Sequence, residues 1–283
     1  MERETSAANN IEAVKNYYEA TAENYLHLLH GRCHYGYTSD NERGPFNIEF
    51  AQLEMENKLG ETLNLPPGST VLDAGCGYSP VARTLTEKFE LKVTGIDLIG
   101  GRLGEGSGPN QSANIQSINL ANADYHFLPF PDESFDGVYT METLVHAYKL
   151  EQVLAEFLRV LRPGGRVALF EYSIPELDSI PTIARNLAER VIRNTGMASL
   201  PYFTHGSFPR ILEDAGFENA KSKNISREVY PSWFYLWKLA IWTTFTKEFS
   251  HGRISLDNIP GSVWIWPARH KLGYNICQAN KPK

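Results

Sequence analysis

The hydrophobic residues of this chain follow two alternating spacings. Short apolar runs bounded by Gly, Pro or Asp are typical of strands that are buried on both faces of a sheet. Such runs lie at residues 70–72, 91–97, 119–123, 135–141 and 166–172. Several of the longer segments between them carry apolar side chains three and four positions apart, which is the helical spacing. Because strands alternate with helices, the pattern predicts an α/β fold built on a mostly parallel sheet.

Two helices are predicted before the first strand. The polar residues 1–10 are expected to be frayed. A helical stripe then begins, with side chains near the helical spacing at Ile11, Val14, Tyr17, Tyr18 and Tyr25. A second helix is predicted at residues 47–63, ended by Pro66, Pro67 and Gly68. We expect residues 1–64 to form helices that cover the active site.

The rest of the chain predicts a core and an insertion. Residues 65–175 contain the five short apolar runs, a glycine-rich loop from residue 100, a helix near residues 111–116 and a helix at 153–161. The segment 173–217 is longer than a plain crossover requires, with predicted helices at 180–192 and 207–216 around an aromatic loop at 200–205. We therefore interpret residues 176–283 as a substrate-selecting insertion together with strands at 217–227 and 272–277 of the same sheet. The aromatic run at 230–242 fits a lid, a core helix or a subunit contact.

The stretch TVLDAGCGYSP, residues 70–80, joins the first strand to a helix. Gly75 and Gly77 form the turn, and Ser79 followed by Pro80 has the pattern of a helix N-cap. Glycines let the backbone approach a ligand without a Cβ clash. The carboxyl ends of strands are where α/β sheets bind nucleotide-like ligands, so we expect Asp73 to face such a ligand.

The residues around this turn favour one class of ligand. The second strand ends at Asp97, where a carboxylate accepts hydrogen bonds from ribose hydroxyls. Enzymes that bind NAD share that acid, but their third glycine is missing here, because Pro80 stands three residues after Gly77. Asp73 would also repel a pyrophosphate. It suits a cation with an amino-acid tail and a ribose, and S-adenosylmethionine (SAM) is such a molecule.

These motifs resemble those of class I SAM-dependent methyltransferases. DAGCG at 73–77 resembles the first motif of that family, IDL at 96–98 its ribose-binding acid, the segment from Asp124 its adenine clamp, and LRPGG at 161–165 the turn before its fifth strand. One departure is Ser79, where the family usually has a third glycine. The resemblance implies a Rossmann-like seven-stranded methyltransferase sheet with SAM as cofactor. The cofactor-binding residues that it implies are Asp73, Gly75, Gly77, Tyr78, Asp97, Leu98, Asp124, Tyr125 and Met141.

Composition narrows the choice of partner. The chain has 283 residues, 42% of them hydrophobic, and a net charge of −6. This length allows one α/β domain with a full core and elaborations. A nucleic-acid substrate is not expected, because the charge is negative and no dense Lys/Arg block is present. We expect a small-molecule partner and leave open whether the chain forms a homo-oligomer.

Cysteines and apolar runs bear on location. Cys33, Cys76 and Cys277 are an odd number without disulfide or metal spacing, which favours a reducing compartment. The charged residues 1–5 precede no apolar core, so no signal peptide is predicted. The most apolar run, at 233–242, is interrupted by Lys238 and is too short to cross a bilayer. We therefore expect a cytoplasmic protein without an integral membrane segment.

A cluster of histidines near Cys33 raises the question of zinc. His27, His30 and His34 lie in the N-terminal region, but no acidic or cysteine pair completes a ligand set. We predict no metal site. The segment is better interpreted as a helix that covers the opening of the cofactor site and keeps water out. His30 and His34 remain weaker candidates for a catalytic base.

The chemistry is predicted where the fourth strand ends. On the start of a helix, Glu142 and His146 at i and i+4 would share a face, and a nearby carboxylate raises the pKa of an imidazole. Such a pair forms an acid–base unit. The alternative is structural, with Glu142 as a cap and His146 bonded to the backbone.

The same stretch, YTMETLVHA at 139–147, resembles a segment of sterol C-methyltransferases. Those enzymes methylate an alkene through a cation that aromatic rings stabilise, and a base then removes a proton. The resemblance assigns Glu142 and His146 as catalytic. It assigns the cation-facing, substrate-binding lining to Tyr17, Tyr18, Tyr25, Tyr35 and Tyr172. Since the chain is shorter than most sterol enzymes, a lipophilic substrate such as a terpenoid or prenylated alkaloid is favoured over sterol itself.

Three activities remain open from the sequence. The first is a methyltransferase of the EC 2.1.1 class that methylates carbon in a bulky lipophilic molecule. The second is O- or N-methylation of a secondary metabolite, with His146 as the base. The third is a SAM-binding fold that transfers no methyl group and instead assists a cyclisation or serves as a subunit.

Overall fold

The structure, a computed structural model, describes residues 7–29, 31–39, 45–100, 118–251 and 266–283; of these, it describes no side chains at 21–28 and 243–251. The helix predicted near residues 111–116 lies outside the described residues.

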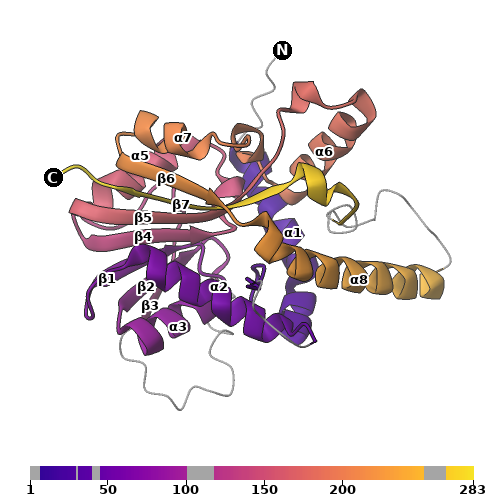
Figure 1. Ribbon diagram of the computed structural model, residues 1–283, viewed down its shortest axis with the longest axis horizontal. Coiled ribbons are helices and arrows are strands. Elements are labelled where there is room, and N and C mark those ends of the chain that lie inside the picture. The colour runs from indigo at the N-terminus through magenta and orange to yellow at the C-terminus, as the bar shows by residue number, and fades with distance from the viewer. Residues whose placement is uncertain (1–6, 30, 40–44, 101–117, 252–265) are drawn as a thin grey trace.

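One mixed sheet organises the molecule (Figure 1). Its order is β3-β2-β1-β4-β5-β7-β6. The strands are β1 (Thr70–Ala74), β2 (Lys92–Asp97), β3 (Ile118–Asn122), β4 (Phe135–Met141), β5 (Leu161–Ser173), β6 (Glu218–Asn224) and β7 (Gly273–Asn280). β1 pairs in parallel with β2 and β4, whereas β7 runs antiparallel to β5 and β6. This architecture confirms the predicted Rossmann-like seven-stranded sheet. Chain order reverses beside β1, and such a switch point opens a crevice at the carboxyl ends of the strands.

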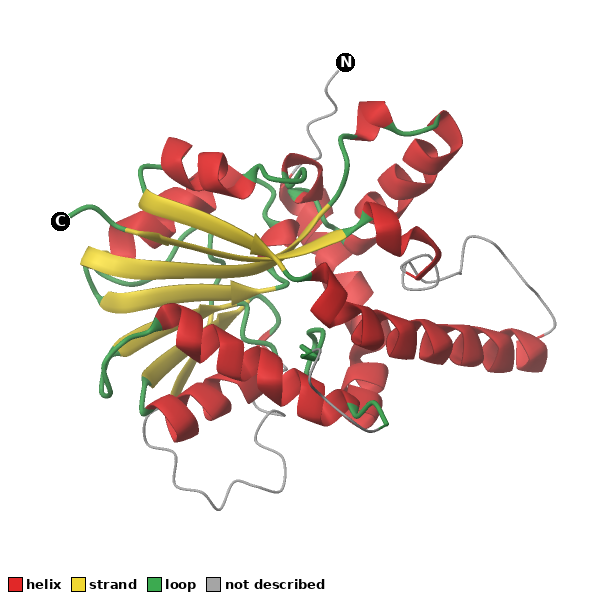
Figure 2. Cartoon of the chain, viewed as in Figure 1, coloured by secondary structure: helices red, strands yellow, loops and turns green. Residues whose placement is uncertain are grey.

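Helices cover both faces of the sheet (Figure 2). On one face lie α2 (Ile48–Leu63) and α3 (Pro80–Phe89), whose apolar stripes put Leu59 and Leu85 into a core against β1 and β2. On the other lie α5 (Leu150–Val160) and α7 (Phe208–Asp214), with Phe157 and Leu212 in a second core. Burial of these side chains stabilises each layer by roughly 1.5–3 kcal/mol per residue.

Three further helices lie beyond the carboxyl ends of the strands. They are α1 (Ala7–Leu29), α6 (Thr182–Thr195) and α8 (Ser226–His251). α1 meets the end of α6 through a hydrogen bond from Asn10 Nδ2 to the Gly196 carbonyl at 2.9 Å. α8 leaves the sheet near the start of β7, where Ser226 Oγ accepts a hydrogen bond from the Tyr274 N–H at 3.0 Å, and extends to one side (Figure 1). Four 3₁₀ turns complete the described chain: η1 (Leu144–His146), η2 (Leu177–Ser179), η3 (Leu200–Tyr202) and η5 (Arg269–Lys271).

Some local predictions need correction. α1 begins at Ala7, so residues 7–10 are helical and not frayed. Ser79 stands at the N-cap of α3, but its side chain makes no capping hydrogen bond, because its φ of 60° is left-handed. Glu142 also has a positive φ, 61°, and only a 3₁₀ turn follows it, so the predicted helix start at residue 142 is wrong. Among the described helices, none has the length and apolar character needed to cross a membrane.

Candidate functional site

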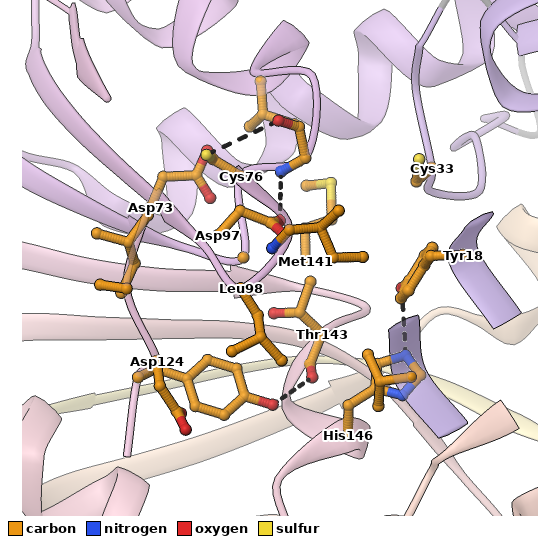
Figure 3. A pocket seen from close by; sticks show the side chains of 18 of the residues that line it. Tyr18, Cys33, Asp73, Cys76, Asp97, Leu98, Asp124, Met141, Thr143 and His146 are labelled. Carbon is orange, nitrogen blue, oxygen red and sulfur yellow. Dashed lines mark hydrogen bonds between the residues drawn. The ribbon is translucent and has the colours of Figure 1, made fainter. Parts of the chain in front are cut away.

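A first cavity lies at the switch point of the sheet (Figure 3). It measures about 100 Å³, and its walls come from the carboxyl ends of β1, β2, β3 and β4 and from α1. Most of the sequence-predicted cofactor residues line it: Asp73, Gly75, Gly77, Asp97, Leu98, Asp124, Tyr125 and Met141. The structure therefore brings together in one place residues that are separated by nearly seventy positions in the chain.

The glycine turn gives this cavity its floor. Gly75 has a φ of +103°, and a Cβ there would lie 2.7 Å from the Thr143 side chain, so a larger residue is excluded. Gly77 has a φ of +51°, yet a Cβ there would meet nothing within 4 Å, so the space beside it is open. The Gly77 N–H donates to Asp97 Oδ2 at 2.9 Å, which ties the turn to the end of β2. These features leave room for a ligand directly against the backbone.

Asp73 is the unsatisfied group in this cavity. Its side chain is buried, and its Oδ2 has no hydrogen-bond partner among the described residues. Burial raises the pKa of Asp73 to about 7. A buried carboxylate oxygen without a partner is costly, so the site favours a ligand that brings a positive charge. SAM fits this requirement because it carries both a sulfonium and an ammonium group.

Asp97 and Asp124 are bonded differently. The Asp97 carboxylate accepts from the N–H groups of Gly77 and Ile99, at 2.9 and 2.8 Å, and keeps lone pairs for ligand hydroxyls. Asp124 Oδ1 instead holds His126 Nδ1 at 2.6 Å. Burial alone would raise the pKa of Asp124, but its bonds with His126 hold it below the usual value. Asp124 lines the cavity while also anchoring its own loop.

A second cavity adjoins the first. It measures about 710 Å³, on the same measure that gives about 100 Å³ for the first. Aliphatic side chains of α6 and α8 form much of its wall, among them Leu187, Val191 and Leu236. Cavities of this size and apolar character suit lipophilic small molecules.

Four residues line both cavities: Tyr18, Cys33, His34 and His146. Figure 3 shows Tyr18 and His146 facing each other at one side of the first cavity, with Cys33 nearby, across from Asp73 and Asp97. A ligand in the first cavity and a ligand in the second would therefore meet at this boundary.

His146 is a buried, neutral imidazole at the boundary. Its Nδ1 lies 3.3 Å from the Gly196 carbonyl, which can only accept, so Nδ1 carries the proton. Nε2 then accepts from the Tyr18 hydroxyl at 3.2 Å. Burial lowers the pKa of His146 to about 4, whereas the sequence pattern led us to expect a raised value. The reason is that no carboxylate bonds the ring.

Glu142 does not bond His146. Its carboxylate accepts hydrogen bonds from the Tyr35 N–H at 2.7 Å, from the Tyr274 hydroxyl at 2.9 Å and from the Tyr172 hydroxyl. Burial raises the pKa of Glu142 in spite of these bonds. The two residues predicted to form one acid–base unit line the same second cavity but have separate partners. Their catalytic roles remain predictions.

The predicted substrate residues are distributed unevenly. Tyr17, Tyr18, Tyr35 and Tyr172 line the second cavity, while the side chain of Tyr25 lies outside the described residues. Tyr78, predicted to bind the cofactor, does not line the first cavity. It is 2% exposed and packs against Gly31, whose Cβ position is 3.1 Å from that of Tyr78. The side chain therefore points into the protein, because the turn at Gly77 directs it away from the ligand space.

Some residues of the site carried little signal in the sequence. Thr143 lines the first cavity, and its hydroxyl donates to the Ala74 carbonyl at 2.7 Å. Glu171 holds the backbone beneath it, since its Oε1 accepts from the N–H groups of Thr143 and Leu144 at 3.1 and 2.8 Å. Burial raises the pKa of Glu171 to about 8. An acid within the apolar fifth strand was the signal that could have found it.

His34 is a structural residue. Its Nδ1 faces the Tyr35 carbonyl at 2.9 Å and its Nε2 faces Glu56 Oε1 at 3.2 Å, while Arg32 Nε also donates to Glu56 at 2.7 Å. Burial alone would raise the pKa of Glu56, but the bond and charge of His34 and the charge of Arg32 lower it to about 2. The side chains of His27 and His30 lie outside the described residues, and within the described ranges no cluster of three His, Cys, Asp or Glu could hold a metal.

Known proteins with a similar sequence or a similar fold include SAM-dependent enzymes. A family model described as "Methyltransferase domain" matches residues 72–169. The S-adenosyl-L-methionine-dependent Diels-Alderase iccD of Talaromyces variabilis is 36% identical over 227 residues, which cover 77% of each chain. Sterol 24-C-methyltransferase ERG6B of Gibberella zeae is 28% identical over 75% of this chain and 58% of its own length. Among solved structures, the [4+2]-cyclase SpnF superposes with a TM-score of 0.75 at 20% identity, covering 96% of both chains.

Proposed function

The chain belongs to the class I SAM-dependent methyltransferase family, and from this premise we propose that it holds SAM in the first cavity while acting on a bulky lipophilic metabolite in the second. The observation that carries the proposal is the shared boundary of Tyr18, Cys33, His34 and His146. Two ligands that meet there can interact without water between them.

The charge of the first cavity supports SAM over a phosphate-bearing cofactor. Asp73, Asp97 and Asp124 line it, and Asp73 has an unpaired oxygen. When bound, SAM would supply a methyl-bearing sulfonium cation. Asp97 would receive ribose hydroxyls, and the open space beside Gly77 would receive the part of the ligand that lies against the turn.

For the reaction itself, an intramolecular [4+2] cyclisation is the candidate best supported. The relative named Diels-Alderase covers more than three quarters of this chain at 36% identity. Such a reaction converts three π bonds into two carbon–carbon σ bonds and one π bond, so no proton leaves and no base is needed. The second cavity fits this chemistry, because two lining groups that could act as bases are already bonded: Glu142 accepts from three donors, and His146 Nε2 accepts from Tyr18. The apolar walls would hold the two reacting π systems close together.

Methyl transfer to carbon is the second candidate. The sterol 24-C-methyltransferase relative and the pair of His146 with Tyr18 favour it. Here a carbon–carbon bond forms, the sulfur–carbon bond breaks, and a proton must leave the resulting cation. Tyr18 O could take that proton as its own passes to His146 Nε2, which is neutral and placed to receive it.

Product mass tests the proposal and separates the two reactions. Purified protein with SAM is incubated with lipophilic polyene metabolites, and products are analysed by intact mass and chromatography. Cyclisation gives a product with the substrate's mass, a new retention time and no S-adenosylhomocysteine. Methyl transfer adds one CH₂ unit in mass and one equivalent of S-adenosylhomocysteine. Absence of SAM binding by calorimetry would refute the whole proposal.

A further inference from the structure

We propose that the substrate carries an anionic hydrogen-bond acceptor, a carboxylate or an enolate, bound by Lys271 at the mouth of the second cavity, and that the Trp233 N–H offers a second donor elsewhere in the same lining. This inference rests on the proposed function, because it assigns a substrate class to the same cavity. It depends on the polar side chains of the cavity lining that lack a partner in the protein.

Most polar lining groups are already satisfied. Glu142 accepts three hydrogen bonds, one of them from the Tyr172 hydroxyl. Both ring nitrogens of His34 and of His146 have partners. The Thr195 hydroxyl donates to the Val191 carbonyl at 2.8 Å. None of these groups can donate to a ligand without giving up a bond inside the protein.

The groups that remain are donors. Trp233 is 1% exposed, and its Nε1 has no hydrogen-bond partner among the described residues. Lys271 lines the cavity, is exposed, and forms no ion pair within the described ranges. An indole N–H and an ammonium can only donate, so a ligand must bring the acceptor.

Charge makes the acceptor an anion. Lys271 is the one lining residue among those described with an unneutralised positive charge, since Arg269 beside it is outside the lining and stacks on Trp266 at 4.2 Å. Glu142 also lines the cavity, but its carboxylate accepts its hydrogen bonds from Tyr35, Tyr274 and Tyr172, and within the described residues it forms no ion pair with Lys271. A hydrocarbon body in the apolar wall with an acidic group at the exposed Lys271 would place each part of the substrate in its preferred surroundings.

A matched pair of probes tests this inference. Decanoate and decan-1-ol share a chain length and differ in the anionic acceptor. We expect the wild-type protein to bind decanoate about tenfold more tightly than decan-1-ol at pH 7.5, since a charge-assisted hydrogen bond contributes more than a neutral one. Lys271→Met should abolish the difference by weakening decanoate alone. Lys238→Met is the control, because Lys238 lies over Phe234 on α8 and does not line the cavity.

Trp233→Phe provides a second test of the inference. It keeps an aromatic ring but removes the N–H donor, so both probes should bind a few-fold more weakly. The inference is overturned if wild type binds the two probes equally, or if Lys271→Met keeps the preference for decanoate. If neither probe binds although SAM binds by calorimetry, the lipophile-binding part of the proposed function fails and this inference fails with it.

Discussion

Replacing Asp73 by Asn tests the physical basis of cofactor binding. The change keeps the size of the side chain and removes its charge. Asp73 is buried with one oxygen unpaired, and burial raises its pKa to about 7. If the ionised carboxylate is the form that attracts the sulfonium and ammonium groups, SAM affinity must rise with pH as this carboxyl ionises.

The size of the effect follows from that pKa. At pH 6 roughly one-tenth of Asp73 is ionised, and at pH 8 roughly nine-tenths. The affinity of wild type should therefore increase about tenfold across this window, which corresponds to about 1.4 kcal/mol. SAM has its own α-amino group, which titrates near this range. The difference between the pH dependence of SAM affinity in the wild type and in Asp73→Asn therefore reports the ionisation of Asp73 alone.

Calorimetry at pH 6, 7 and 8 is the assay. Asp73→Asn should bind SAM more weakly at pH 8 and approach wild type at pH 6. Asp124→Asn is the control, because hydrogen bonds from His126 already hold the pKa of Asp124 below its usual value. That variant should shift affinity by a similar factor at every pH. Parallel curves for wild type and Asp73→Asn would refute the reasoning.

The same change has a predicted effect on folding. The pKa of Asp73 is raised in the folded protein, so between about pH 4 and pH 7 the folded state holds a proton that the unfolded state has lost. Linkage then makes this carboxyl reduce stability as pH rises through that window. Without SAM, Asp73→Asn should therefore melt at or above the wild-type temperature at pH 8. Weaker binding with a stable fold separates loss of charge from misfolding.

Three other predictions concern the boundary and the second cavity. Tyr18→Phe removes the donor to His146 Nε2. Turnover should fall roughly 10²-fold or more if the reaction transfers a methyl group with proton loss, and change little if it is a cyclisation. Product formation measures turnover, and SAM binding is measured in parallel. Glu142→Gln keeps the shape but replaces a carboxylate that accepts three hydrogen bonds, so thermal unfolding should show a loss of about 1–3 kcal/mol; an unchanged melting temperature would contradict the described bonding. Ala188→Trp places a large ring in the wall of the second cavity and should weaken binding of decan-1-ol. Calorimetry should show SAM affinity within about twofold of wild type, and an equal loss of both ligands would contradict this assignment.

The sequence by itself determined the sheet and the cofactor turn, because both depend on local patterns. Apolar runs indicated the strands, and the spacing of Asp73, Gly75, Gly77 and Asp97 placed acids and glycines at the carboxyl ends of β1 and β2. These two strands are parallel neighbours, so the sheet brings those residues together. Local spacing could not decide the direction of Tyr78, because a left-handed residue at Gly77 reverses which side faces the ligand.

Only the tertiary structure decided how the chemical groups are paired. Glu142 and His146 are four residues apart, and the sequence favoured a pair on one helix. Strand β7 instead brings Tyr274 to Glu142, and α1 brings Tyr18 to His146. The unpaired donors of Trp233 and Lys271 likewise became visible only once α8 and the start of β7 enclosed the cavity. Hydrogen-bond partners over such separations depend on packing between elements, and no local pattern in the chain encodes that packing.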